Sequence, residues 1–337
     1  MIELTDNRTY REPINFELSA GSSLQLRARS GFRPVLLLSD STTWATVSGR
    51  DDSRFTLDGI LIAGLPVNIE GDLSQVAIRH CTLLPGSTIQ RDCRPDRPDE
   101  PSLVLLKTRA TLHIQSSIVG SIQVKQDEVG TDPTPICISD SILDATGSDR
   151  EAIGSDADLL AHAVLTIRRS TVMGYIEVHA IELAENSIFT GHVKAGRRQV
   201  GCMRFCYVPP GSRTPRRYRC QPDLVRSTVE DECETAIEKA TDAGDTRHVA
   251  VLEAERDRLI ASQELRTQPT FNGLRHGLPT YCQLAGSCAD EIKRGADDES
   301  EMGVFHDLYE PQRFSTLDAR LDEYTPADTD AGIIFAT

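Results

Sequence analysis

The chain has 337 residues, and 39% of them are hydrophobic, which is enough for a packed core and too much for a disordered polymer. Its 51 Asp and Glu against 36 Lys and Arg give a formal net charge of −15, which argues against nucleic acid as a partner. No stretch approaches the roughly 20 apolar residues of a membrane span, and the N-terminus lacks the layout of a signal peptide. We therefore expect a protein that is made and stays in the cytoplasm, one that leaves it as part of a larger assembly, or a chain that is cut from a longer one.

Short runs rich in Ile, Val, Leu and Thr follow one another from about Phe16 to Val208, often with apolar and polar residues in alternation. Alternation at period two is what a half-buried β-strand requires. The runs also share a motif in which a small polar residue precedes an aliphatic one. Its clearest copies are Cys81-Thr82-Leu83, Ser116-Ser117-Ile118, Asp140-Ser141-Ile142, Ser170-Thr171-Val172 and Asn186-Ser187-Ile188.

Because this motif recurs in the same phase, with loops of variable length and no helical pattern between the copies, the sequence predicts a parallel β-helix. The repeat count indicates roughly seven to nine coils. The small polar residue at each corner is expected to bond backbone groups of neighbouring coils.

Past Pro222 the composition changes to segments dense in Glu, Ala, Arg and Leu with apolar residues at helical spacing. A turn at Asp242–Asp245 divides this region, which predicts a helical hairpin. Farther on, a short helix is expected over Arg313–Tyr324 and a closing strand over Gly332–Thr337. The predicted organisation is a parallel β-helix over 1–222, an inserted helical hairpin over 223–265, and an irregular C-terminal segment over 266–337 that packs on or caps the solenoid.

The repeated motif, from about Ile2 to Val208, resembles the right-handed parallel β-helix of the pectin-lyase-like superfamily. This resemblance implies an all-β solenoid, but that fold serves lyases, hydrolases, adhesins and phage tailspikes. More particular stretches are RPVLLLSD (Arg33–Asp40), FTLDGILIAG (Phe55–Gly64), CYVPPGSRTPRRYRCQPD (Cys206–Asp223) and ADDESEMGVFHDLYEPQR (Ala296–Arg313). Together they resemble bacterial β-helix proteins associated with phage-tail-like or contractile-injection loci. That likeness implies a structural or surface-recognition role and transfers no catalytic residue.

An enzymatic β-helix would place carboxylates beside a basic residue on one outer face. The candidates here are Asp58, Asp140, Glu177 and Glu185, with Arg168 as the basic residue. A soluble solenoid also needs polar outward positions, and carboxylates serve that purpose without any chemistry. Polysaccharide lyase or glycoside hydrolase action on acidic glycans is therefore the alternative to a non-enzymatic role.

Cys202, Cys206 and Cys220 lie close together in an arginine-rich segment and are the best candidates for zinc ligands. A fourth ligand would come from Cys282, Cys288, Cys233 or His276. Two other interpretations stay open, namely a disulfide to the Cys282–Cys288 segment and buried free thiols.

Arg213, Arg216, Arg217 and Arg219 form the core of a basic loop that suits an anionic glycan, a phosphate or a protein partner. The acidic run downstream offers another explanation, because it can pair with the loop and hold the C-terminal segment in place. The same run is also a candidate for calcium. Its members are Asp290, Glu291, Asp297, Asp298, Glu299 and Glu301.

Two functional hypotheses follow. The first is a non-enzymatic structural or surface-recognition protein, a component of a phage-tail-like assembly that contacts protein partners or a surface glycan and is able to form homo-oligomers. The second is the carboxylate-dependent glycan enzyme. An enzyme should gather its carboxylates with a basic residue in a groove, whereas a scaffold should show charges that are scattered or paired.

Overall fold

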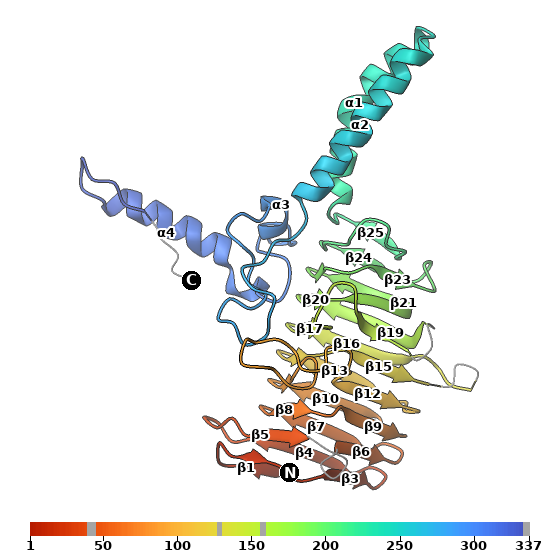
Figure 1. Ribbon diagram of the computed structural model, residues 1–337, viewed down its shortest axis with the longest axis vertical. Coiled ribbons are helices and arrows are strands. Elements are labelled where there is room, and N and C mark those ends of the chain that lie inside the picture. Colours follow the sequence, from red (N-terminus) through yellow and green to blue (C-terminus); the bar gives the residue numbers. More distant parts are fainter. Residues whose placement is uncertain (39–44, 127–129, 156–159, 333–337) are drawn as a thin grey trace.

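The computed structural model describes residues 1–38, 45–126, 130–155 and 160–332, and it shows a parallel β-solenoid with helical appendages near its C-terminal end (Figure 1). The strands form a 17-stranded and an 8-stranded sheet, and every pairing between successive coils is parallel in these sheets. The predicted β-solenoid is thus confirmed.

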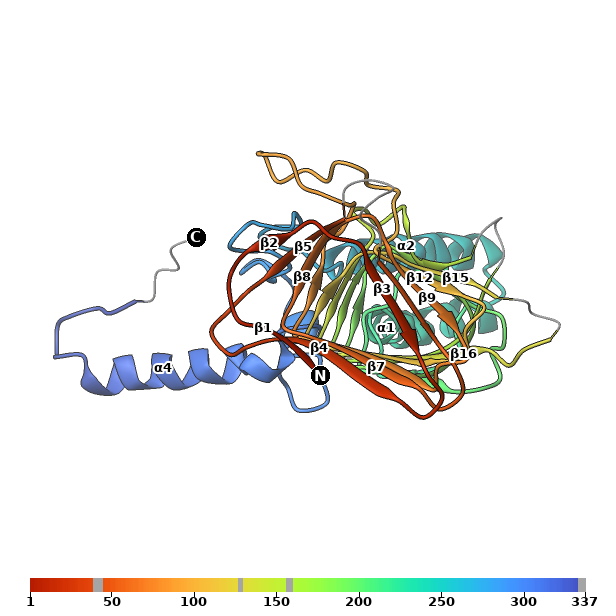
Figure 2. The same cartoon turned by 90° about the horizontal axis from the view of Figure 1, so that it is seen from below.

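Strand pairing follows three faces, which we call A, B and C in the order in which each coil visits them (Figure 2). Face A contains β1 (Ile2–Leu4), β4 (Ser23–Ala28), β7 (Arg54–Asp58), β10 (Gln75–Arg79), β13 (Thr111–Gln115), β16 (Thr134–Ser139), β19 (Ala161–Arg168), β24 (Cys202–Arg204) and β25 (Arg216–Tyr218). Face B contains β2 (Thr9–Tyr10), β5 (Val35–Leu38), β8 (Leu61–Gly64), β11 (Thr82–Leu83), β14 (Ile118–Val119), β17 (Ile142–Asp144), β20 (Thr171–Met173) and β22 (Ile188–Phe189). Face C contains β3 (Ile14–Leu18), β6 (Ala45–Gly49), β9 (Val67–Gly71), β12 (Leu103–Leu106), β15 (Ile122–Lys125), β18 (Glu151–Gly154) and β23 (Val193–Ala195).

Faces A and C belong to one sheet because β21 (Tyr175–Glu185) runs through the corner between them. Its first residues pair with β18 and β23 on face C, and its last residues pair with β19 and β24 on face A.

The core is a stack of aliphatic side chains that point inward from equivalent positions. On face A, Val76 pairs with Leu112, Leu112 with Ile136, and Ile136 with Leu165. The last three are completely buried. Complete burial of one Leu or Ile side chain contributes about 1.5–3 kcal/mol, so the stack favours this register over any shifted one.

A ladder of hydroxyl groups lines the corner between faces A and B. Ser117, Ser141, Ser170 and Ser187 each donate a hydrogen bond to the carbonyl two residues earlier. Each also accepts one from a backbone N–H in the preceding coil, at 3.1 or 3.2 Å. The predicted role of the corner residue is confirmed at these positions, and Cys81 occupies the equivalent place in an earlier coil.

The predicted helical hairpin is α1 (Asp223–Asp242) and α2 (Thr246–Arg266), which project from the end of the solenoid (Figure 1). The side chain of Asp245 caps α2 by accepting a hydrogen bond from the backbone N–H of His248 at 3.0 Å. The hairpin follows the last coil closely: β25 ends at Tyr218 and α1 begins at Asp223.

Residues 267–309, which we call the cap, pack on the side of the solenoid over face B. They include the short helix α3 (Asp290–Lys293) and a 3-10 turn at His306–Leu308. Buried contacts join Leu284 and Ile292 of the cap to Ile188 on β22. The predicted short helix is α4 (Glu310–Tyr324), which extends away from the cap (Figure 2). The closing strand predicted over Gly332–Thr337 cannot be followed, because residues 333–337 lie outside the described residues.

Candidate interaction surfaces

Two of the candidate catalytic carboxylates, Asp140 and Glu185, are engaged in ion pairs with arginine. Asp140 lies at the corner after β16 and receives Arg169 through two hydrogen bonds, at 2.5 and 3.0 Å. Glu185 pairs with Arg204 at 2.5 Å and has Arg168 at 3.8 Å. Each pair links two neighbouring coils, so these charges add to the contacts between coils.

The other two candidates lie elsewhere. Asp58 ends β7, in register with Arg27 and Arg79 of the neighbouring strands. Glu177 lies on face C and pairs with Lys194 at 3.1 Å. Arg168 lines neither of the two pockets found on the described solenoid, and Glu177 lies on a different face from Glu185.

Glu177 instead lines a shallow pocket of about 390 Å³ beside face C. Lys194, Arg213, His192 and Tyr175 line the same pocket. An isolated parallel bridge joins Lys194 to Arg213 and brings the arginine-rich loop next to this face. The structure thus places together two residues that the sequence assigned to different hypotheses, Glu177 as a catalytic group and Arg213 as a binding group.

The arginine-rich loop divides into one structural residue and three accessible ones. Arg217 is 18% exposed at its side chain and bonds Asp223, in the first turn of α1, at 3.0 Å. It also donates to the Thr214 hydroxyl at 2.8 Å, so it fastens the hairpin to the last coil. Arg213, Arg216 and Arg219 are exposed. The Arg219 guanidinium lies 5.8 Å from the ring of Tyr218, which is 58% exposed.

The acidic run does not pair with this loop among the residues that the structure describes, so the predicted link between the two is wrong. Glu291 pairs with Arg266 at the end of α2, and Asp290 pairs with Lys293 at 3.1 Å. Asp297 and Asp298 face His306 within the cap. The acidic run therefore stabilises the cap and its attachment to α2.

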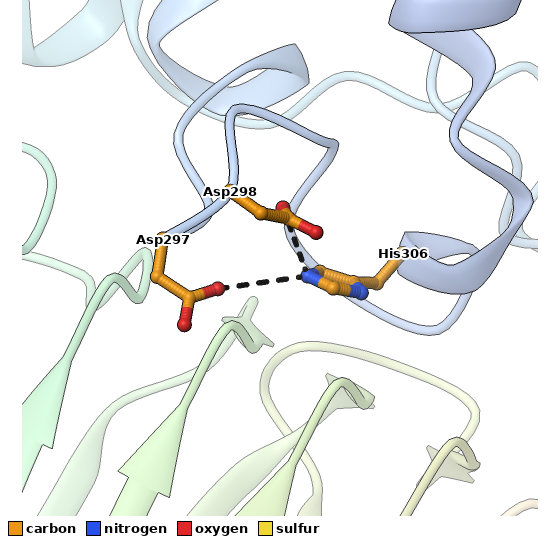
Figure 3. A group of neighbouring side chains, drawn as sticks. All are labelled: Asp297, Asp298 and His306. Carbon is orange, nitrogen blue, oxygen red and sulfur yellow. Dashed lines mark ion pairs between the residues drawn. The ribbon is translucent and has the colours of Figure 1, made fainter.

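His306 is the centre of a polar cluster at the junction of the cap and the solenoid (Figure 3). Its side chain is only 7% exposed, and its Nε2 lies 3.3 Å from Asp298 and 3.8 Å from Asp297. Its Nδ1 lies 3.0 Å from Asp307. Asn186, at the solenoid corner, donates to Asp297 at 2.7 Å and accepts from the Asp297 backbone N–H at 3.2 Å. The cluster thus holds the cap against the coil that contains Asn186.

Asp297, Asp298 and His306 are also the one group of candidate metal ligands within the described part of the chain. Desolvation by burial acts to raise the pKa of Asp298, but hydrogen bonds from Ser300 act in the other direction. The pKa of Asp298 is lowered as a result, which keeps this carboxylate charged. One imidazole and two carboxylates suit a transition-metal ion better than calcium, which takes oxygen ligands. In the sequence these aspartates belong to the acidic run, and their joint contact with His306 was not predicted.

Cys206 and Cys220 continue the corner ladder. The Cys206 thiol donates to the carbonyl of Arg204 at 3.1 Å, and the Cys220 thiol lies 3.6 Å from the carbonyl of Tyr218. Burial raises the pKa of Cys206 well above its ordinary value, which favours the protonated thiol. Cys202 is partly exposed on β24, and all nine cysteines are free of disulfides. These positions favour the free-thiol interpretation over the zinc site. Among the described residues, the group of candidate metal ligands consists of Asp297, Asp298 and His306 and includes no cysteine.

A second buried junction joins the cap to β17. The Tyr281 hydroxyl donates to Asp144 at 2.6 Å, and Cys282 packs against Met173 of β20. Burial raises the pKa of Asp144 although the hydrogen bond from Tyr281 opposes this effect. Asp144 was not predicted as a functional residue, because its partner is 137 positions away in the chain.

The hairpin and α4 present apolar side chains to solvent. On the hairpin, Val251 is 58% exposed and Leu265 is 72% exposed. The outer part of α1 is acidic and carries Glu230, Asp231, Glu232, Glu234 and Glu238. The described part of α4 has no buried residue at all.

Comparisons with protein-family models, with curated proteins and with solved structures found no match. The structure therefore supports the parallel solenoid that the resemblance to the pectin-lyase-like superfamily implied, but the chain is not assigned to a family. No helix within the described ranges is long and apolar enough to cross a membrane.

Proposed function

We propose that the chain is a non-enzymatic structural or recognition component of a larger protein assembly of the phage-tail-like kind, made in the cytoplasm and carried out of it within that assembly. The observation that carries this proposal is the helical hairpin, which projects from the end of the solenoid (Figure 1). A pair of helices of 20 and 21 residues with few buried side chains contributes little to the core of its own chain.

The solenoid supplies a rigid support for this hairpin. Hydrogen bonds join each coil to the next along three faces, and Arg217 ties the start of α1 to the last coil. At the hairpin base, Arg226 pairs with Glu264 at 2.8 Å and fixes α1 to α2. A partner that binds the hairpin is thereby held in a fixed orientation to the solenoid axis. The acidic outer part of α1 favours a partner with a basic surface.

The ion pairs on the solenoid support the same proposal. Glu185, Asp140 and Glu177 each have a basic partner in a neighbouring coil. This is the paired arrangement expected of a scaffold.

Shortening the hairpin tests this function. Replacement of residues 231–258 by a short Gly-Ser turn removes the outer part of both helices and keeps the Arg226–Glu264 pair at the base. In the native cell, a tagged wild-type chain should be isolated in a stoichiometric complex whose cross-links map to α1 and α2. The shortened chain, whose circular dichroism should lose only the helical signal of the replaced segment, should lose that complex. A complex that survives the shortening would overturn the proposal.

The pocket beside face C favours a second candidate function, recognition or cleavage of an acidic glycan. Lys194 and Arg213 offer cationic donors for a uronate or sulfate, Tyr175 offers an aromatic ring, and Glu177 is the carboxylate near them. Binding and depolymerisation assays on a panel of acidic polysaccharides test it. Binding that is lost in Arg213→Ala supports recognition, and turnover that is lost in Glu177→Gln supports cleavage. The absence of both binding and turnover across the whole panel would exclude this function.

A further inference from the structure

Helix α4 carries an apolar stripe that its own chain leaves largely exposed. Phe314, Leu317, Leu321 and Tyr324 follow one another at spacings of three and four residues, so they lie on one side of the helix. Leu317 is 46% exposed and Tyr324 is 77% exposed. α4 extends away from the solenoid (Figure 2). Phe314 has a contact of its own and is still 42% exposed, so the side chains of the stripe are accessible to another molecule.

The contacts between α4 and the cap come from the opposite side of the helix. Ser315 accepts a hydrogen bond from Arg294 at 3.2 Å, and Gln312 donates one to the carbonyl of Asp298 at 3.3 Å. At about 100° per residue, Ser315 and Gln312 lie on the far side of α4 from Leu317 and Leu321. The cap therefore holds α4 with its apolar stripe directed outward.

The charges beside the stripe indicate what covers it. The stripe occupies the a and d positions of two heptads, which places Arg313 and Arg320 at g and Asp318 at e. In a parallel pair of such helices, Arg313 meets Asp318 of the partner subunit. In an antiparallel pair, the arginines at the g positions of one helix would face the arginines at the g positions of the other. Arg313, Asp318 and Arg320 have no ion pair within the described part of the chain, so these charges are available to a partner.

We propose that the chain self-associates through α4, which packs in parallel against the α4 of a second copy. The charge pattern is complementary to itself in this orientation and repulsive in the other, which selects a second copy of this chain as the occupant. This inference goes beyond the proposed function, because it concerns self-association and not the partner of the hairpin. A helix of 15 residues offers two heptads, so the association depends on concentration and on the solenoid that holds each helix in place.

Light scattering on the purified full-length chain over a concentration series tests the association. At high concentration the wild-type chain should have a multiple of the 37.1 kDa chain mass. Leu321→Asp places a charge in the stripe and should give the monomer mass throughout, with unchanged circular dichroism because α4 contributes no buried residue. Glu323→Arg, on the far side of the helix, is the matched control and should associate as the wild type does.

Charge exchange tests the orientation. Asp318→Arg places arginine against arginine in a parallel pair and should weaken association at least tenfold. Adding Arg313→Asp to that variant restores opposite charges and should restore association. The proposal is overturned by a wild-type chain that stays monomeric, by association that survives Leu321→Asp, or by a double variant as weak as the single one. The hairpin-shortened chain should self-associate as the wild type does, so loss of hairpin function leaves this result unchanged.

Discussion

Replacement of Ser141 by alanine should destabilise the solenoid far more than the loss of one oxygen atom suggests. The Ser141 hydroxyl accepts a hydrogen bond from the backbone N–H of Ser117 at 3.1 Å and donates one to the carbonyl of Ser139 at 2.6 Å. Alanine would leave the Ser117 N–H, in a buried corner, without a partner. Because an unsatisfied buried donor costs about 1–3 kcal/mol, we expect the free energy of unfolding to fall by about 2 kcal/mol.

Two further variants make this prediction specific to the ladder. Ser141→Cys should retain most of the stability, because Cys81 and Cys206 occupy equivalent corners and their thiols donate to the equivalent carbonyls at 3.0 and 3.1 Å. Ser139→Ala, at the end of β16 two residues before the corner, is the control and should change the free energy of unfolding by less than about 0.5 kcal/mol. The assays are equilibrium denaturation and hydrogen exchange at the Ser117 amide. The reasoning is refuted if Ser141→Ala behaves as the wild type, or if Ser141→Cys is as damaging as alanine.

Three further predictions concern the cap. Burial, with the nearby charge of Glu310, raises the pKa of Glu301 to about 7 from 4.5, so its ionisation should cost stability as pH rises through that window. Glu301→Gln should therefore stabilise the cap by about 3 kcal/mol at pH 8 and by little at pH 4, measured by hydrogen exchange, and an equal effect at both pH values would contradict this cause. Tyr281→Phe removes a donor to Asp144, whose pKa burial already raises, so it should destabilise the cap by about 1–3 kcal/mol at pH 7 and less at pH 4, where Asp144 gains its own proton. His306→Ala should speed proteolytic cleavage within residues 267–309, and cleavage at the wild-type rate would show that the cluster does not hold the cap.

The solenoid could be predicted because its signal is local and repeated. The motif at Ser117, Ser141, Ser170 and Ser187 marks the same corner in successive coils, and each copy reports the same turn and the same hydrogen bonds. The helices of the hairpin and α4 could also be predicted, because the apolar residues that indicate each helix lie within a single segment of the sequence.

The contacts of the cap could not be predicted, because nothing local specifies them. Tyr281 meets Asp144 across 137 positions, and Asn186 meets Asp297 across 111. Opposite charges alone led to a wrong pairing of the arginine-rich loop with the acidic run, because the fold places Arg217 beside Asp223 and Glu291 beside Arg266 instead. Cys206 and Cys220 were candidate zinc ligands because they lie close together in the sequence, although they repeat the serine positions of the ladder.

Cross-linking mass spectrometry of the tagged full-length chain isolated from its native cells tests the proposed function most directly. The wild-type chain should give a stoichiometric complex with intermolecular cross-links that concentrate on α1 and α2. The same experiment on the chain with residues 231–258 replaced should give the solenoid without that partner. An isolated wild-type chain with no partner, together with turnover of an acidic glycan that Glu177→Gln abolishes, would contradict the account and identify an enzyme.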